Sequence, residues 1–186
     1  MVYLIVIGKM LLKILYFFMK FIPTKKNRIL FLSRQSNSLT LDFKLIINKL
    51  PKSYDIKYVC NRFEGKKADK KIFLFLILTI KSMYYLATSK VCIIDSYSLP
   101  VSILKHKKSL KIIQIWHALG KIKKSGYQTL GKKAGRNPKI AKILNMHKNY
   151  DYVIAGAQSW NFAYCDSFGI KKDVILNYGL PRGEYI

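Results

Sequence analysis

His117 is the residue of this sequence best placed to act as a base. It follows an apolar run, residues 112–115, and Trp116, and a small-residue turn containing Gly120 comes directly after it. A neutral imidazole near physiological pH is a suitable general base for a hydroxyl nucleophile. A lone histidine after a strand more often only bonds a neighbouring carbonyl, so the residues around it decide the interpretation.

A basic cluster of Lys121, Lys123 and Lys124 follows the turn. Ammonium groups neutralise phosphates as point charges, although lysines in a solvated loop are the plainer interpretation. A strand that ends in an imidazole, with Gly120 and several cations just beyond, suits binding and deprotonating a phosphate-linked substrate. We therefore expect His117 to be catalytic, and Gly120 and the three lysines to bind substrate.

Other polar residues near expected strand ends are weaker candidates for a functional role. Arg182 follows a proline in a rigid segment, where it is suited to a bidentate phosphate contact. Asp95 is suited either to orienting another group or to capping a turn. His106 lies in a basic segment, and His147 lies near the end of a predicted helix. We expect both side chains to be solvated or to cap a helix.

The cysteines argue against a metal site. Cys60, Cys92 and Cys165 are far apart, and no Cys/His pair has the spacing of metal ligands. The glycine-rich fingerprints of dinucleotide-binding and NTP-binding proteins are also missing. We expect no metal and no bound cofactor.

Short apolar runs alternate with helix-length segments from residue 27 onward. Strands are expected at residues 28–33, 55–60, 90–96, 110–116, 151–157 and 174–177, and helices at 39–49, 72–89, 98–106, 138–148 and 158–168. Such alternation predicts an α/β fold, a Rossmann-like parallel sheet with helices on both faces. Ligands bind at the carboxyl ends of the strands in these sheets, which is where His117 and segment 179–182 belong.

The first 22 residues are strongly apolar and end at Pro23. Lys9, Lys13 and Lys20 fall on roughly one face of a helix. This pattern favours a helix lying in the membrane interface over a core helix or a spanning segment, because charges near a bilayer centre are costly. The expected organisation is a membrane-associating helix over residues 1–23 and one domain over residues 27–186.

The charge balance is strongly basic, with 34 Lys and Arg against 9 Asp and Glu and a net charge of +25. Such a field attracts polyanions, including an anionic membrane surface. The charge is spread along the chain rather than gathered in a basic arm, so we expect no nucleic-acid partner.

Three local motifs resemble the CDP-glycerol glycerophosphotransferase family of teichoic acid synthesis. They are YLATSKVCIIDSY at residues 85–97, QIWHALGKIKKSGY at 114–127 and GLPRGEY at 179–185. The resemblance covers residues 84–186. One departure is Glu184, where the family commonly has aspartate.

The resemblance implies the N-terminal domain of a GT-B fold, peripheral on the cytoplasmic face of the membrane. It implies transfer of glycerol phosphate from the donor CDP-glycerol to a hydroxyl of a lipid-linked polyol-phosphate acceptor, with His117 as the base. Family members continue for about another domain, which holds the donor. We therefore expect this chain to be a truncated product, one half of a split enzyme or a repurposed remnant, inactive alone. In the split form it would act with a separate C-terminal half. The alternative is a non-catalytic membrane-surface module that binds anionic lipid or polymer.

Overall fold

The apolar runs form one fully parallel sheet in the computed structural model of the protein. The structure describes residues 2–63, 68–118, 120, 123–133 and 135–185. Within these residues six strands lie in the order β2-β1-β3-β4-β5-β6. Their bounds are β1 Arg28–Ser33, β2 Asp55–Cys60, β3 Val91–Ile94, β4 Lys111–Gln114, β5 Tyr152–Ile154 and β6 Ile175–Leu176. The predicted parallel α/β sheet is confirmed.

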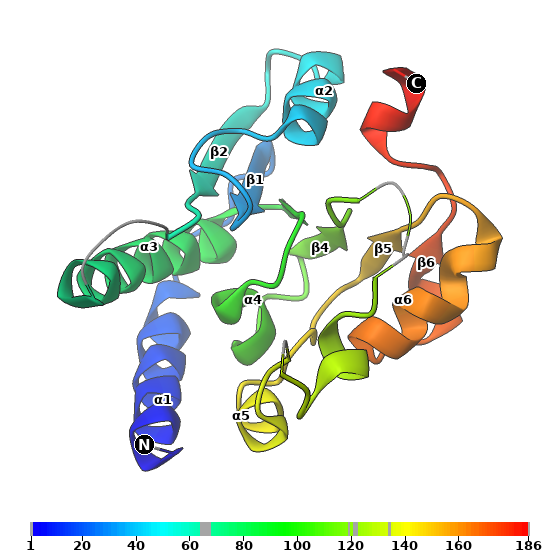
Figure 1. Ribbon diagram of the computed structural model, residues 1–186. Helices are drawn as coiled ribbons and strands as arrows, with labels where there is room; N and C mark the ends of the chain where they lie inside the picture. The colour runs from blue at the N-terminus through cyan, green and yellow to red at the C-terminus, as the bar shows by residue number, and fades with distance from the viewer. Residues whose placement is uncertain (1, 64–67, 119, 121–122, 134, 186) are drawn as a thin grey trace.

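Helices connect the strands as crossovers (Figure 1). The α-helices are α1 Val2–Met19, α2 Leu41–Lys49, α3 Ala68–Thr88, α4 Leu99–Ile103, α5 Pro138–Ile143 and α6 Asn161–Phe168. The 3₁₀ helices are η1 Gly126–Thr129, η2 Gln158–Trp160, η3 Lys172–Val174 and η4 Pro181–Tyr185.

The alternation of side chains along β1 divides the core into two layers. Leu30 and Leu32 pack into the larger layer, which contains residues of α1, α3, α4 and α6. Phe31 points the other way and packs on Phe43 of α2 with ring centroids 5.0 Å apart. Both faces of β1 are therefore buried, as the continuous apolar run RILFLS predicts.

Helix α5 is shorter than the predicted segment 138–148. Asn137 caps its start by accepting from the backbone N–H groups of residues 139 and 140. After Ile143 the chain turns through Asn145, His147 and Asn149, which all have positive φ. Left-handed residues cannot continue an α-helix, and asparagine adopts this conformation more readily than most side chains.

Two helices in the described chain, α1 and the stretch Lys70–Thr88 of α3, are long and apolar enough to cross a membrane by length and composition. Helix α3 packs with one side on β1 and β2. Helix α1 is mostly exposed, but it docks on the domain through buried Tyr16, whose hydroxyl lies 2.9 Å from His106 Nδ1.

Lys9 of α1 also bonds the domain, through Ile143 O and Asn145 Oδ1. Lys9 therefore contacts the domain, whereas the predicted interfacial helix would turn this lysine toward the lipid head groups. His106 is partly buried between Tyr16 and Val101 O, so the expectation of a solvated side chain is wrong.

Candidate active site

A strained turn after β4 presents His117. Trp116 has φ +60°, a conformation that costs an L-residue with a bulky side chain roughly 1–2 kcal/mol. Its backbone N–H donates to the side-chain oxygen of fully buried Gln114, 2.8 Å away, which holds the turn in place. The abrupt end of the strand in the sequence thus corresponds to a turn that places His117 beside the end of β3.

A backbone carbonyl fixes the tautomer of His117. Nδ1 of the ring lies 2.9 Å from Asp95 O, at the end of β3. A carbonyl oxygen only accepts, so Nδ1 carries the proton and Nε2 keeps its lone pair. The Trp116 ring stacks on the imidazole with centroids 4.1 Å apart, and packs in turn on Phe168. This geometry prepares Nε2 to accept a proton.

Asp95, whose backbone carbonyl contacts this histidine, is 1 % exposed. Its Oδ2 accepts from Ser33 Oγ at 2.7 Å, and its Oδ1 has no hydrogen-bond partner among the described residues. Burial raises the pKa of Asp95, whereas Ser33 and, more weakly, His117 lower it. In its ionised form, Asp95 stabilises an imidazolium formed at His117.

A cavity of about 310 Å³ opens beside His117. Residues from separate strand ends and loops line it, among them Ser96, Tyr97, His117, Lys124, Arg136 and His147. The described part of the lining contains cationic and hydroxyl groups but no carboxylate. Such a lining suits an anionic ligand with hydroxyl groups.

The structure brings only some of the predicted substrate-binding residues to this cavity. Lys124 lines it, whereas Gly120, which is half-buried, and Lys123, which is exposed, lie outside its lining. Lys121 lies outside the residues that the structure describes. The contribution of Gly120, Lys121 and Lys123 to substrate binding remains a prediction.

Arg182 forms an ion pair with the buried Asp42 of α2. Its Nε lies 3.0 and 2.9 Å from the two carboxylate oxygens, and its backbone N–H donates to Oδ1 at 3.1 Å. Asp42 is the main cause that raises the pKa of Arg182. The guanidinium therefore joins η4 to α2, and its predicted phosphate contact remains a prediction.

His147 belongs to the same cavity, a placement that sequence reasoning missed. It is 5 % exposed, and its Nδ1 lies 2.9 Å from Tyr150 Oη. The ring also stacks on Phe168 with centroids 4.6 Å apart. The expectation of a solvated or capping histidine was wrong because the chain turns inward after α5 instead of continuing as a helix.

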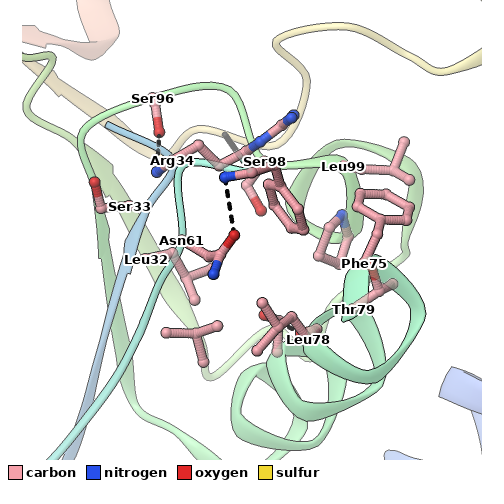
Figure 2. A pocket seen from close by; sticks show the side chains of 14 residues that line it. Leu32, Ser33, Arg34, Asn61, Phe75, Leu78, Thr79, Ser96, Ser98 and Leu99 are labelled. Carbon is pink, nitrogen blue, oxygen red and sulfur yellow. Dashed lines mark hydrogen bonds between the residues drawn. The ribbon is translucent and has the colours of Figure 1, made fainter. Parts of the chain in front are cut away.

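A smaller hollow of about 50 Å³ lies at the ends of β1 and β2, under Arg34 (Figure 2). Figure 2 shows Leu32 and Leu78 on its apolar side and the Arg34 side chain at its rim. Ser96 borders both cavities, and its Oγ accepts from Arg34 N at 3.0 Å. This hollow is too small for a substrate, so it is a packing space beside the larger cavity.

The sequence profile described as CDP-glycerol:poly(glycerophosphate) glycerophosphotransferase matches residues 14–186. Among similar curated proteins, the teichoic acid ribitol-phosphate primase of Bacillus spizizenii is 29 % identical over 167 residues, which cover 88 % of this chain and 42 % of the primase. The teichoic acid glycerol-phosphate primase of Bacillus subtilis is 35 % identical over 102 residues, 55 % of this chain and 27 % of that protein. The chain thus spans less than half the length of these relatives.

Solved structures of the wall teichoic acid polymerase TagF share the fold. One, soaked with CDPG, superposes with a TM-score of 0.65 at 16 % identity, covering 93 % of this chain and 46 % of the polymerase chain. Another TagF structure gives a TM-score of 0.57 at 17 % identity, with 87 % and 40 % covered. At this identity the likeness concerns the fold.

Proposed function

Since the chain belongs to the CDP-glycerol:poly(glycerophosphate) glycerophosphotransferase family, we propose that it transfers glycerol phosphate from CDP-glycerol to a hydroxyl of a lipid-linked acceptor in teichoic acid synthesis. Residues 27–186 act as the N-terminal domain of a GT-B fold, with residues 1–23 as the membrane-associating helix. The observation that carries the proposal is His117, held with Nε2 available by Asp95 O at 2.9 Å.

In the proposed reaction, His117 Nε2 accepts the proton of the acceptor hydroxyl. The acceptor oxygen then attacks the phosphorus atom that carries glycerol, a new P–O bond forms, and the bond to the bridging oxygen of CMP breaks. CMP leaves with the electron pair, and the proton stays on His117 until solvent removes it. General-base assistance of this kind contributes about 10²–10⁴ in rate.

Positive charge around the cavity supports the same step. Lys124 and Arg136 line the cavity with His117. Cations near the transferred phosphoryl group stabilise the negative charge that develops on its oxygens. A second domain supplies the nucleotide site, as a continuation of this chain or as a separate C-terminal half.

We place the protein peripherally on the cytoplasmic face of the membrane. Helix α1 exposes a row of large apolar side chains, including Leu4, Leu11 and Phe18, which are 73 %, 62 % and 62 % exposed. Contacts at Lys9 and Tyr16, about 10 Å apart along the helix axis, hold α1 against the domain. A helix tied down at two points with an apolar outer face suits insertion into the membrane interface.

The same exposed face supports the second candidate, a non-catalytic module that holds anionic lipid or polymer. A transfer assay separates the two. The full chain, in nanodiscs with a CDP-glycerol-binding domain, is given CDP-glycerol and a lipid-linked acceptor ending in glycerol phosphate. The transferase is expected to release CMP and lengthen the acceptor by one glycerol phosphate per CMP. Acceptor binding without any CMP release under these conditions would leave the binding module as the function.

A further inference from the structure

The crossover direction of the sheet reverses between β1 and β3. From β1 the chain passes outward to β2, whereas β3, β4, β5 and β6 follow one another in the other direction. Open α/β sheets bind ligands at such a switch point, beyond the carboxyl ends of the two central strands. Arg34 follows the end of β1 and Tyr97 follows the end of β3. Both residues therefore lie where this fold class binds ligands.

Hydrogen bonds join the two strand ends rigidly. Ser33 Oγ donates to Asp95 Oδ2 at 2.7 Å, and Arg34 N donates to Ser96 Oγ at 3.0 Å. Ser33 Oγ also accepts from Gln35 N at 3.0 Å. The backbone that carries Arg34 is thus fixed to the backbone that precedes Tyr97, so the bases of the two side chains are held in a defined relation.

Arg136 lies against the Tyr97 ring, and Arg34 lies beside Phe63, with its Cζ 5.5 Å from the centroid of that ring. Arg136 Cζ lies 4.4 Å from the Tyr97 ring centroid. Partial burial and the neighbouring Arg136 both lower the pKa of Arg34, which places the two like charges close together. Across the described ranges, no carboxylate lies within ion-pair distance of either arginine, in contrast to Arg28 and Arg182, which pair with Asp55 and Asp42. Nearby like charges repel, and a bound anion removes that cost.

The Tyr97 hydroxyl points to a ligand site independently of the arginines. Its oxygen is buried and has no hydrogen-bond partner among the described residues. Burial raises the pKa of Tyr97, while Arg136 and Arg34 lower it. Buried polar atoms in folded proteins are nearly always satisfied, and an O–H group on a ring that contacts a guanidinium is a suitable donor to an anion.

We propose that Arg34, Tyr97 and Arg136 form a binding site for a phosphate ester, the terminal polyol phosphate of the acceptor. This assignment rests on the proposed function for the identity of the ligand. Tyr97 and Arg136 line the same cavity as His117, so a phosphate held by them leaves the polyol hydroxyl in the cavity that contains the base. Planar guanidinium groups bind phosphate oxygens in a bidentate manner, which a lysine does not reproduce.

The test is the binding of glycerol 3-phosphate to the full chain in detergent, without donor. We expect glycerol 3-phosphate to bind more tightly than glycerol. Arg34→Gln and Arg136→Gln should each weaken its binding about tenfold or more, because each removes a charge-assisted hydrogen bond. Arg34→Lys keeps the charge but loses the planar guanidinium group, so its affinity for glycerol 3-phosphate should lie between those of the wild type and Arg34→Gln. The matched control is Lys90→Gln, which removes one exposed charge at the opposite, amino-terminal edge of the sheet and should leave affinity unchanged.

Tyr97→Phe distinguishes binding from folding. It should weaken glycerol 3-phosphate binding several-fold while leaving the unfolding midpoint unchanged or higher, because it removes a buried hydroxyl that lacks a partner. Equal binding by the wild type and all the variants would overturn the proposal, as would a wild type that binds glycerol 3-phosphate no better than glycerol.

A second arm separates this ligand from membrane head groups. Partitioning of the chain onto phosphatidylglycerol vesicles should be the same for wild type and Arg34→Gln. Loss of partitioning with unchanged glycerol 3-phosphate binding would mean that the arginines contact lipid, and the proposal would be wrong. The binding assay contains no CDP-glycerol, so its result does not depend on transfer. If glycerol 3-phosphate binds as expected but the transfer assay shows no CMP release, the binding site is supported and the proposed function is wrong. If CMP is released but glycerol 3-phosphate does not bind, the binding site is wrong and the proposed function is supported.

Discussion

Tyr16→Phe removes the hydroxyl group that docks α1 on the domain. Tyr16 is 1 % exposed, and its hydroxyl lies 2.9 Å from His106 Nδ1, while His106 Nε2 lies 2.8 Å from Val101 O. Val101 O only accepts, so Nε2 donates and Nδ1 accepts from Tyr16. The substitution keeps the ring packed and leaves Nδ1 without its donor. An unsatisfied buried acceptor costs roughly 1–3 kcal/mol of unfolding free energy.

The assay is urea unfolding of wild type, Tyr16→Phe and the control Tyr3→Phe in one detergent. Tyr3 is 84 % exposed, so its variant should match wild type within about 0.5 kcal/mol. We expect Tyr16→Phe to lower the unfolding midpoint without changing the slope. Equal midpoints for the two variants would refute the inferred docking.

The pH dependence of stability tests the same hydrogen bond in a second way. Burial lowers the pKa of His106 below its ordinary value of 6.5. The unfolded chain then binds more protons than the folded chain below that value, so stability falls as pH falls through 6.5 toward the folded pKa. Tyr16→Phe should reduce this dependence, because the hydrogen bond from the tyrosine favours neutral His106. A wild type whose stability rises on acidification through this range would contradict the assignment.

Three further predictions concern the packing around the site and the membrane helix. Gly126→Ala should destabilise the fold by at least about 1 kcal/mol, because φ is +56° and a Cβ would lie 2.0 Å from Ser167 O; Gly8→Ala, with open space around it, should be neutral or stabilising in the same thermal melts. Arg182→Gln should lower the free energy of unfolding in urea by about 3 kcal/mol, because it leaves the buried Asp42 charge without its partner. Lys171→Gln, at an exposed lysine, should change it very little. Similar midpoints for both variants would show that the ion pair contributes little to stability. Leu4→Glu with Leu11→Glu should reduce flotation with anionic vesicles, and Leu41→Glu on α2 should not; undiminished flotation would exclude the outer face of α1 as the membrane contact.

Local sequence patterns were sufficient to predict the bounds of some strands. The bounds of β1 and β2 agree with the predicted runs 28–33 and 55–60. The run RILFLS is buried throughout, whereas in DIKYVC apolar residues alternate with Asp55 and Lys57. The strand predicted at 110–116 ends at Gln114, since pairing with β3 and β5 decides where hydrogen bonding stops. Composition alone does not show the length of a neighbouring strand.

The candidate site was only partly predictable for a similar reason. A strand end followed by a small-residue turn was enough to single out His117. Arg34 and Tyr97 come from loops 63 residues apart, and nothing local relates them. Their proximity follows from the strand order β2-β1-β3, which places the end of β1 beside the end of β3. His147 was misjudged because the left-handed turns after α5 are a consequence of tertiary packing.

The role of His117 is tested most directly by single-turnover CMP release from CDP-glycerol with a lipid-linked acceptor. His117→Gln is compared with wild type and with Lys90→Gln, each supplied with the same nucleotide-binding domain. If Nε2 is the base, His117→Gln should slow release about 10²–10⁴-fold with donor binding unchanged, and Lys90→Gln should retain the wild-type rate. A rate for His117→Gln within about twofold of wild type would contradict the assignment.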